Sequence, residues 1–460
     1  MQTRDYRNPQ SAIRNPQSEN PQSAIRNPQS SNPQSAIRNP QLGRGGPDMD
    51  LDSAAMRAVV QETFAAYSLG RRVLAIVPDK TRDDPTDVLF PILCKELPPS
   101  VERIDVLIAQ GTHPPMTDAE KRAKIGLSHE RSSLPRLGII FDHHWDDPAH
   151  LVSIGRLSAA RVREITGGLF AESIDLRINR LLGPGVYDTV FVIGGTTPHE
   201  VAGFSGGTKY FFPGVGGPDV THATHWVGAL ATIEHTIGRV DTPIRRLLDE
   251  VASFVPLQVI SFNSVSNRTD EGRLRSHALF TGDITQAFRR ATEVSAQVHI
   301  QYMPRRFCQV VALLDPHYDE MWTGGKASYR LGAVIEPGGE LLIYAPHLRT
   351  VSKTHGKLIR KYGYHVLDRV REWVERNEDL RENLCVAAHL THVRYAGEWK
   401  NGIETPRFHI TLASQVPESE CRQVNLGYLD PAGFDPTRYQ DSDSVIVENA
   451  GRDLYLCNGG

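Results

Sequence analysis

The sequence predicts an α/β protein made of two units with parallel-rich sheets, preceded by a tail of low complexity. From residue 49 onward, short apolar runs alternate with helix-like stretches, which is the pattern of strands joined by crossover helices. A second series of this kind begins at residue 308. Residues 7–41 instead repeat the seven-residue unit Asn-Pro-Gln-Ser-Ala-Ile-Arg, with some truncated copies.

The repeat has the period of a coiled coil, but its prolines exclude one, because each removes a helical hydrogen bond and clashes with the preceding turn. It also holds too few apolar residues to offset the entropy of ordering. We therefore predict that residues 1–48 are disordered. They form either a docking arm or a translated DNA repeat upstream of a start at Met49 or Met56, and we favour the translated repeat.

The first unit is expected to begin with the apolar strand at residues 72–77. Further strands are predicted at residues 103–109, 137–141 and 188–193. Helices are predicted at residues 85–97, 218–230 and 242–255, after Thr117 as far as Gly126, and after Asp283 as far as Ala296. Asp84, Thr117 and Asp283 are placed to cap three of these helices, since short polar side chains there accept hydrogen bonds from the first turn.

The second unit is predicted to contain strands at residues 308–314 and 340–344, on either side of a helix at residues 320–335. That helix contains the pair Gly324-Gly325, and each glycine costs about 1 kcal/mol relative to alanine. A helix start tolerates this cost where the backbone must approach a ligand. Lys326 would then lie close to an anion, although a frayed helix end with a solvated lysine remains the alternative.

Composition excludes several classes of protein. The net charge is −3, with 51 basic and 54 acidic residues, so no strong field attracts nucleic acid or an anionic membrane. No window approaches the roughly 18 apolar residues of a membrane helix, and the N-terminus lacks the apolar segment of a secretory signal. The five cysteines are scattered, which fits reduced thiols. We predict a cytoplasmic protein that binds neither nucleic acid nor membrane, and leave its oligomeric state open.

Polar clusters follow three of the predicted strands, at residues 78–83, 109–116 and 194–209. Ligands of open parallel sheets bind outside the carboxyl ends of the strands, so these loops are expected to meet at one rim. The third loop carries five glycines, whose backbone N–H groups can approach an anion closely. Lys209 at its end adds a charge or a nucleophilic amine.

Two familiar motifs are excluded at this loop. A P-loop fails because Thr208 replaces its second glycine and Tyr210 its magnesium-binding hydroxyl. A zinc-protease motif fails because Gly203 stands where the second histidine belongs. His222 and His225 are three apart, which on a helix places both on one face. A zinc-type metal-dependent hydrolase or lyase that uses this pair is therefore one alternative function.

His113 and His199 interrupt glycine-bearing loops at strand ends, so they could act as general bases on opposite sides of one substrate. Together the motifs resemble the nickel-dependent lactate racemase family from about residue 50 to the C-terminus. The residues that carry the resemblance are G-T-H-x-P at 111–115, P-H-x-x-A-G-F-S-G-G-x-K at 198–209, and His225 sixteen residues beyond Lys209. The resemblance implies two α/β domains with the active site in the cleft between them.

The resemblance also implies a role for each matching position. Lys209 would hold the pyridinium-3,5-bisthiocarboxylic acid mononucleotide, either through an amide-type bond or noncovalently. His225 would bind its nickel, and the sulfur, carbon and sulfur atoms of this nickel-pincer nucleotide would complete the coordination. His113 and His199 would be the acid/base pair. Further contacts are expected for the cofactor from Asp79, Thr81, Gly206 and Gly207, and for the substrate from Arg82, Lys326, Trp322 and Thr323.

The activity implied is inversion of C2 of a 2-hydroxy acid by proton-coupled hydride transfer. One histidine removes the hydroxyl proton while the hydride moves to the cofactor, and the other histidine serves the opposite face. Cofactor-maturation proteins would be partners. The alternative from another class is a non-catalytic sensor of hydroxy acids or nucleotides, in which the histidines would be dispensable.

Two departures from the family pattern bear on the substrate. Asp83 and Asp84 follow Arg82 where the family usually has Thr-Arg-Pro, so an acidic group could weaken carboxylate binding or bind substrate hydroxyls. Trp322 and Thr323 replace a tyrosine and a glutamine of lactate-specific members. We therefore expect a substrate larger than lactate, with an aryl or alkyl group against Trp322 as one possibility.

We accordingly predict four segments. These are a disordered repeat tail at residues 1–48, a cofactor-binding α/β domain at 49–290, a substrate or lid domain at 291–400, and a segment at 401–460 that returns to the first domain.

Overall fold

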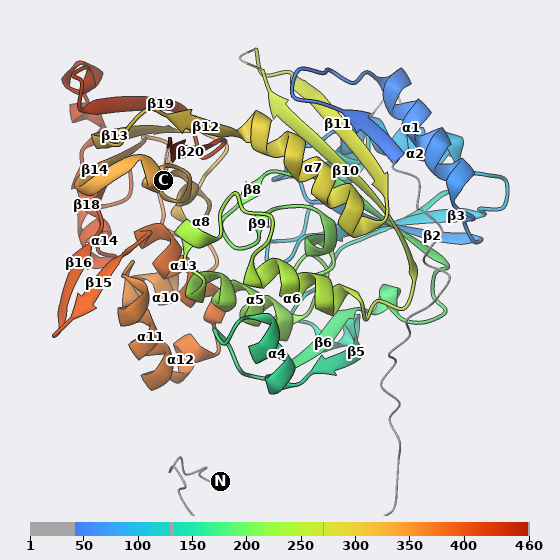
Figure 1. Ribbon diagram of the computed structural model, residues 1–460, viewed down its shortest axis with the longest axis horizontal. Coiled ribbons are helices and arrows are strands. Elements are labelled where there is room, and N and C mark those ends of the chain that lie inside the picture. The colour runs from blue at the N-terminus through green and yellow to red at the C-terminus, as the bar shows by residue number, and fades with distance from the viewer. Residues whose placement is uncertain (1–41, 129–132, 270, 459–460) are drawn as a thin grey trace, which may run out of the picture. The chain divides into compact units, whose positions relative to one another are not determined.

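The computed structural model describes residues 42–128, 133–269 and 271–458. These residues are built around a seven-stranded sheet and a five-stranded sheet, with helices packed against both (Figure 1). Most strand pairs in the two sheets are parallel. The predicted α/β class with parallel-rich sheets is confirmed.

The first sheet has the strand order β1-β11-β10-β7-β2-β3-β4. Its five strands from β10 to β4 are parallel, whereas β11 runs antiparallel to β10 and β1 antiparallel to β11. The bounds are β1 (Leu42–Gly45), β2 (Arg72–Pro78), β3 (Arg103–Ala109), β4 (Leu137–Phe141), β7 (Thr189–Gly195), β10 (Gln258–Arg268) and β11 (Leu274–Gly282).

Helices cover both faces of this sheet, so its central strands are apolar throughout. In β2, Val73 and Val77 pack in the cluster that includes residues of α1 and α2. Leu74 and Ile76 of the same strand pack in the cluster formed with α5 and α6. The helices of this part are α1 (Ser53–Ala66), α2 (Thr86–Glu96), α3 (Asp118–Lys124), α4 (Ala159–Ile165), α5 (Pro218–Leu230), α6 (Pro243–Ala252) and α7 (Ile284–His299).

Two of the three predicted helix caps are confirmed. Thr117 forms a capping box at the start of α3, and the Asp283 carboxylate accepts two N–H groups at the start of α7. The third prediction is wrong, since the residue at the N-cap of α2 is Pro85. The Asp84 carboxylate lies one residue earlier, where it accepts the Thr86 N–H at 3.1 Å and lies 2.8 Å from a lysine ammonium.

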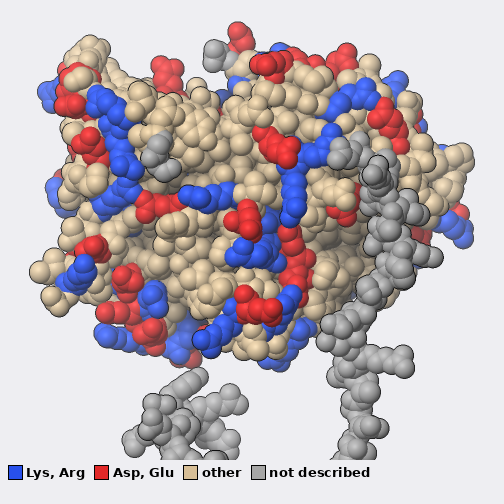
Figure 2. Space-filling model, viewed as in Figure 1, with Lys and Arg blue, Asp and Glu red and all other residues tan. Residues whose placement is uncertain are grey.

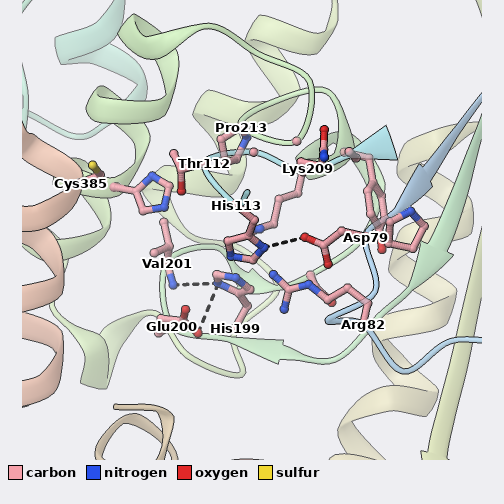
Figure 3. Close-up of a pocket in the computed structure, with 18 of the residues that line it drawn as sticks. Asp79, Arg82, Thr112, His113, His199, Glu200, Val201, Lys209, Pro213 and Cys385 are labelled. Carbon is pink, nitrogen blue, oxygen red and sulfur yellow. Dashed lines mark hydrogen bonds and ion pairs between the residues drawn. The ribbon is translucent and has the colours of Figure 1, made fainter. Parts of the chain in front are cut away.

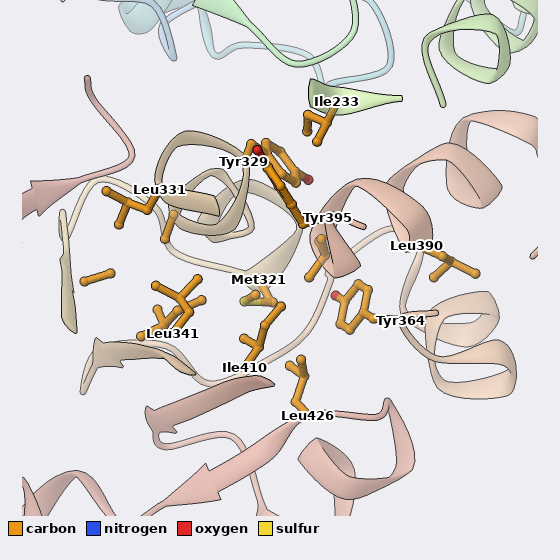
Figure 4. Packing of buried hydrophobic residues seen from close by; sticks show 14 of the residues in the cluster. Ile233, Met321, Tyr329, Leu331, Leu341, Tyr364, Leu390, Tyr395, Ile410 and Leu426 are labelled. Carbon is orange, nitrogen blue, oxygen red and sulfur yellow. The ribbon is translucent and has the colours of Figure 1, made fainter. Parts of the chain in front are cut away.

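The second sheet is parallel and has the order β18-β17-β14-β13-β19. Its bounds are β13 (Phe307–Leu314), β14 (Ile335–Ala345), β17 (His409–Ser414), β18 (Gly427–Leu429) and β19 (Ser444–Ala450). The helices are α8 (Met321–Gly324), α9 (Lys326–Leu331), α10 (Gly356–Tyr362), α11 (Leu367–Arg376), α12 (Glu378–Arg381), α13 (Leu384–Arg394) and α14 (Glu418–Gln423). Their apolar side chains form the core in Figure 4.

The helix predicted at residues 320–335 is divided, because α8 ends at Gly324 and α9 begins at Lys326. The glycine pair allows close packing. A Cβ atom on Gly324 would lie 2.9 Å from Leu314, and one on Gly325 would lie 2.7 Å from Val393. Packing against the strand and helix below therefore accounts for these glycines without a ligand.

Four two-stranded sheets complete the fold of the described residues. They pair β5 (Leu151–Leu157) with β6 (Ile174–Asn179), β8 (Pro198–His199) with β9 (Gly203–Phe204), β12 (Ile300–Met303) with β20 (Leu454–Cys457), and β15 (Gly397–Lys400) with β16 (Ile403–Pro406). His199 lies in β8, which pairs with β9 in a short antiparallel hairpin after β7.

The structure differs from the prediction in where the tail ends and in which sheet the C-terminal strands join. Residues 1–41 of the predicted tail lie outside the described residues, but Leu42–Gly45 form β1 against β11, because this stretch lacks proline and its N–H groups can pair. The expected return of residues 401–460 to the first domain does not hold for β17, β18 and β19. These strands pair within the second sheet, to which the crossover helices α13 and α14 lead the chain back. The division at residue 290 stays a prediction.

Charged side chains of both signs are interspersed over the face seen in Figure 2. Many of them are paired, as in Arg161 with Glu250 at 2.9 Å. Within the described part of the chain, no helix combines the length and apolar character that a membrane span requires.

Candidate active site

The loops that follow β2, β3 and β7 meet at one end of the first sheet, because the three strands are parallel neighbours. Together with α5 and helices of the second sheet they enclose a cavity of about 130 Å³. Figure 3 shows side chains of these loops pointing toward one another. The cavity is lined by the following residues predicted from the sequence: Asp79, Arg82, His113, His199, Gly206, Lys209, His225 and Trp322.

The four predicted substrate-binding residues and Thr81, predicted to contact the cofactor, border a neighbouring cavity of about 350 Å³. It is lined by Thr81, Thr323 and Lys326. Arg82 and Trp322 contact both cavities, so the two spaces adjoin at these side chains. Of the predicted site residues, Gly207 lines neither of these two cavities.

The glycines of the loop after β7 are required at least partly by packing. Gly206 lines the cavity at φ +91°, and a Cβ there would meet Thr196 Oγ1 at 2.6 Å. Gly207 donates its N–H to Asn263 Oδ1 at 3.1 Å, so this N–H is not free for an anion. A Cβ on Gly203 would lie 1.9 Å from a backbone oxygen. Substitution at any of these positions would displace the loop.

His113 is oriented by Asp79. The imidazole Nδ1 lies 2.6 Å from Asp79 Oδ2, while Oδ1 accepts the Thr81 N–H and hydroxyl at 2.9 and 2.6 Å. Burial alone would raise the pKa of Asp79, but the hydrogen bond and charge of His113 and the nearby Arg82 hold it well below its usual range. The carboxylate therefore keeps the proton on Nδ1 and leaves Nε2 as an acceptor.

His199 has the opposite arrangement. Its Nδ1 accepts the Val201 N–H at 3.1 Å, so the neutral ring carries its proton on Nε2. The side chain is 8% exposed. Burial lowers the pKa of His199 well below its usual value, and the charges of Lys209 and Arg82 lower it further. The two imidazoles thus present a lone pair and an N–H group to the same site.

Three cations are gathered at the site without a neutralising carboxylate in contact. Burial lowers the pKa of Lys209 to about 7, and the charge of Arg82 contributes. The pKa of Lys326 falls to about 7 for the same reasons, in the same order. In the described part of the chain, neither amine nor the Arg82 guanidinium forms an ion pair within 4 Å. Such a cluster favours anionic ligands, and at neutral pH it leaves an uncharged, nucleophilic fraction of Lys209.

The aspartates that follow Arg82 are held by other cations. Asp83 Oδ1 accepts from the guanidinium of Arg268, with Nε at 3.0 Å. Asp84 lies 2.8 Å from the ammonium of Lys124 and is fully buried. Both carboxylates are therefore paired with cations other than Arg82.

His225 on α5 has one ring nitrogen engaged and one free. Its Nδ1 lies 2.7 Å from the Thr221 carbonyl oxygen and donates to it, which leaves the Nε2 lone pair free. Burial is the main cause that lowers the pKa of His225 to about 4, so the ring is neutral at pH 7. His222 does not join it, because it stands edge-on to Trp145 and lies 3.5 Å from the Cys385 nitrogen.

The zinc-type alternative lacks a ligand set in the described chain. Over residues 42–128, 133–269 and 271–458, no group of three or more His, Cys, Asp and Glu side chains is placed to hold a metal ion. A metal bound through His225 therefore needs its other ligands from a non-protein group.

Sequence reasoning missed several residues that line the cavity, namely Glu200, Tyr329, Cys385, His389 and His392. Three of these lie on α13, which packs against α5. Their spacing of four and then three residues was the available signal, because it places them on one helix face. Arg330 joins α9 to the site, since its Nη2 donates to the Pro198 carbonyl oxygen at 2.9 Å.

Trp322 is also engaged within the protein. Its ring lies 4.3 Å from His355 and 4.2 Å from His389, measured between centroids. These imidazoles use ring surface that an aryl group of a substrate would need.

Comparison with known proteins assigns this arrangement to a family. Residues 51–238, which contain both motif-bearing loops and α5, match the model of the lactate racemase N-terminal domain. The chain belongs to the lactate racemase family. No curated protein sequence matches it.

Two solved structures resemble this member of the lactate racemase family. A crystal structure of a protein from Thermotoga maritima is 32% identical, covers 90% of this chain and 100% of its own, and superposes with a TM-score of 0.81. The lactate racemase apoprotein from Thermoanaerobacterium thermosaccharolyticum is 16% identical, covers 92% of this chain and 95% of its own, and has a TM-score of 0.65. At that identity the second likeness concerns the fold.

Proposed function

We propose that the protein is a racemase or epimerase that inverts C2 of a 2-hydroxy acid by proton-coupled hydride transfer, with a nickel-pincer nucleotide as cofactor. The observation that carries the proposal is that His113, His199 and Lys209 line one cavity with His225. Membership of the lactate racemase family supports the reaction class.

The residues at the site fit this cofactor. The lowered pKa of Lys209, about 7, makes its amine available for an amide-type bond. His225 offers one free nitrogen to nickel, and the remaining ligands must come from the cofactor because the described chain supplies no cluster. When bound, the cofactor supplies an electron-accepting ring that takes up and returns the C2 hydride.

The protein residues bind and orient the substrate. The guanidinium of Arg82 can bind a carboxylate through two parallel hydrogen bonds, and Lys326 adds a second charge to the lining of the same adjoining cavity. Because burial lowers the pKa of Lys326 and the charge of Arg82 lowers it further, a bound carboxylate would stabilise the charged form of this amine. These contacts would hold the 2-keto acid in place between the two hydride transfers.

The imidazoles move the hydroxyl proton. Nε2 of His113 can accept it from one enantiomer, and Asp79 stabilises the imidazolium that results. His199 supplies or takes the proton on the opposite face. Two bases are required, because each mirror form presents its hydroxyl to a different side of the site.

We propose a substrate larger than lactate. Thr323 and Trp322 border the space where its side chain would lie. Since two imidazoles already contact Trp322, hydrogen-bonding substituents fit this wall better than an aryl group.

Three measurements test the proposal. The protein is produced with cofactor-maturation proteins and given a panel of 2-hydroxy acids deuterated at C2. Retention of the label during inversion supports hydride transfer, whereas exchange with solvent contradicts it. Intact mass measurement should show an adduct that disappears in Lys209→Ala, and an unchanged wild-type mass would contradict covalent attachment. Replacement of His113 or His199 should abolish turnover, whereas a sensor would keep its ligand response.

A further inference from the structure

The carboxylate of Glu200 lies beside His199 and has no role in the proton transfers proposed for the two histidines. Glu200 Oε2 is 3.6 Å from His199 Nδ1, and its side chain is 16% exposed. Figure 3 shows the two groups facing each other at the edge of the cavity. No side chain in the described part of the chain donates a hydrogen bond to this carboxylate. Glu200 is thus a largely buried carboxylate that accepts from its own backbone N–H and from no described side chain, and it lies next to the imidazole of His199.

The present hydrogen bond of His199 is incompatible with half of the reaction. While Val201 N–H donates to Nδ1, the neutral ring holds its proton on Nε2. Nε2 then cannot accept a proton from a substrate hydroxyl. His113 has no such restriction, because Asp79 keeps its proton on Nδ1. A racemase needs both histidines as acceptors in turn, so His199 requires its own partner for Nδ1–H.

We propose that Glu200 is the positioning residue of His199, which accepts a hydrogen bond from Nδ1–H during turnover and so frees Nε2 to take and return the substrate proton. The inference rests on the proposed racemase function. The required movement is small, since the two atoms need to approach from 3.6 Å to about 3 Å. Glu200 then does for His199 what Asp79 does for His113.

The proton count is the same in both directions. With one enantiomer bound, His113 is neutral and His199 is an imidazolium that faces Glu200. After inversion, His113 holds the extra proton and His199 is neutral, with Nδ1–H still bonded to Glu200. One proton is therefore shared between two carboxylate-backed imidazoles. The His199 tautomer that accepts the Val201 N–H at Nδ1 does not take part in these proton transfers.

The charges around the pair are compatible with this role. Burial is the largest cause that lowers the pKa of His199. The charges that lower it further belong to Lys209, Arg82, Lys326 and His225. Burial raises the pKa of Glu200, but Lys326, its own backbone N–H, Arg330 and His392 together lower it, so Glu200 is an anion at neutral pH. Binding of a substrate carboxylate to Arg82 and Lys326 would reduce their effect on His199 and make the imidazolium accessible.

The test is Glu200→Gln, which keeps the shape and removes the charge. Its control is Glu250→Gln, a carboxylate that pairs with Arg161 on the surface. The titration of His199 is followed by ¹⁵N NMR in the full chain labelled at histidine, and kcat is measured against pH with cofactor-loaded protein. We expect Glu200→Gln to move the His199 titration about one to three pH units lower and to reduce kcat about 10- to 100-fold. Glu200→Asp should recover part of both effects.

The outcomes separate this inference from the proposed function. An unchanged His199 titration in a folded Glu200→Gln protein overturns the inference, even if kcat falls. A shifted titration with kcat within twofold of wild type also overturns it. If Glu200→Gln does not fold, Glu200→Asp takes its place. A Glu200→Asp protein whose His199 titration and kcat equal those of wild type would overturn the inference, because the shorter side chain must weaken the bond to His199 Nδ1. Failure of wild-type, cofactor-loaded protein to invert any 2-hydroxy acid rejects the proposed function, while the titration still reports on the pair.

Discussion

Replacing Lys209 by methionine should stabilise the protein made without cofactor. The pKa of Lys209 falls from 10.5 in the unfolded chain to about 7 in the folded one, with burial as the main cause and the charge of Arg82 next. At 1.36 kcal/mol per pH unit, this shift costs the folded state about 4 kcal/mol at pH 7, as an upper value. Methionine has a similar length and no charge to desolvate, so Lys209→Met should recover part of that cost.

The stability of the wild-type protein depends on pH because the folded and unfolded chains bind different numbers of protons at Lys209. Between pH 7 and 10.5 the unfolded chain holds a proton at Lys209 that the folded chain has lost, so wild-type stability rises with pH through this range. The advantage of Lys209→Met is therefore largest at pH 7 and below, and it shrinks toward pH 10.5.

Urea denaturation of both proteins at pH 7 and pH 9.5 measures the difference. Lys400→Met is the control, because the Lys400 ammonium is exposed beside Glu398. Equal stability of Lys209→Met and wild type at pH 7, or a gain that does not depend on pH, would refute the electrostatic account of the site.

Three further predictions concern turnover of the cofactor-loaded protein. Asp79→Asn should lower kcat about 10- to 100-fold, because it removes a charge-assisted hydrogen bond to His113 worth about 1.5–3 kcal/mol; a kcat within twofold of wild type would contradict the role of Asp79. Arg82→Lys keeps the charge but loses the bidentate geometry, so steady-state kinetics should show KM raised about tenfold, and an unchanged KM would remove Arg82 from carboxylate binding. The double replacement Trp322→Tyr and Thr323→Gln should shift the ratio of kcat/KM toward lactate in direct competition with larger 2-hydroxy acids, and an unchanged ratio would show that these positions do not select the side chain.

The convergence of the predicted site residues follows from rules that act locally along the chain. The apolar runs of β2, β3 and β7 identify buried parallel strands, and polar residues follow each run directly. Parallel strands place such loops at one rim, so His113 and His199 could be expected near Lys209 before any contact was known. Their roles in catalysis stay predictions.

The features that could not be predicted depend on contacts between distant segments. The partners of Asp83 and Asp84 are Arg268 and Lys124, and no pattern in the loop itself indicates them. The wall that α13 contributes exists because that helix packs on α5, more than 150 residues earlier in the chain. Gly325 is explained by Val393 at 2.7 Å from its Cβ position, a contact that only the folded chain reveals.

The hydrogen bond from Arg330 to the Pro198 carbonyl oxygen has a mechanical consequence. Arg330 lies on α9, the helix that begins with Lys326, and Pro198 precedes His199 in the short strand β8. The bond therefore connects the helix that carries Lys326 to the peptide unit next to His199. Any displacement of α9 that keeps this bond would therefore move Lys326 and the backbone next to His199 together.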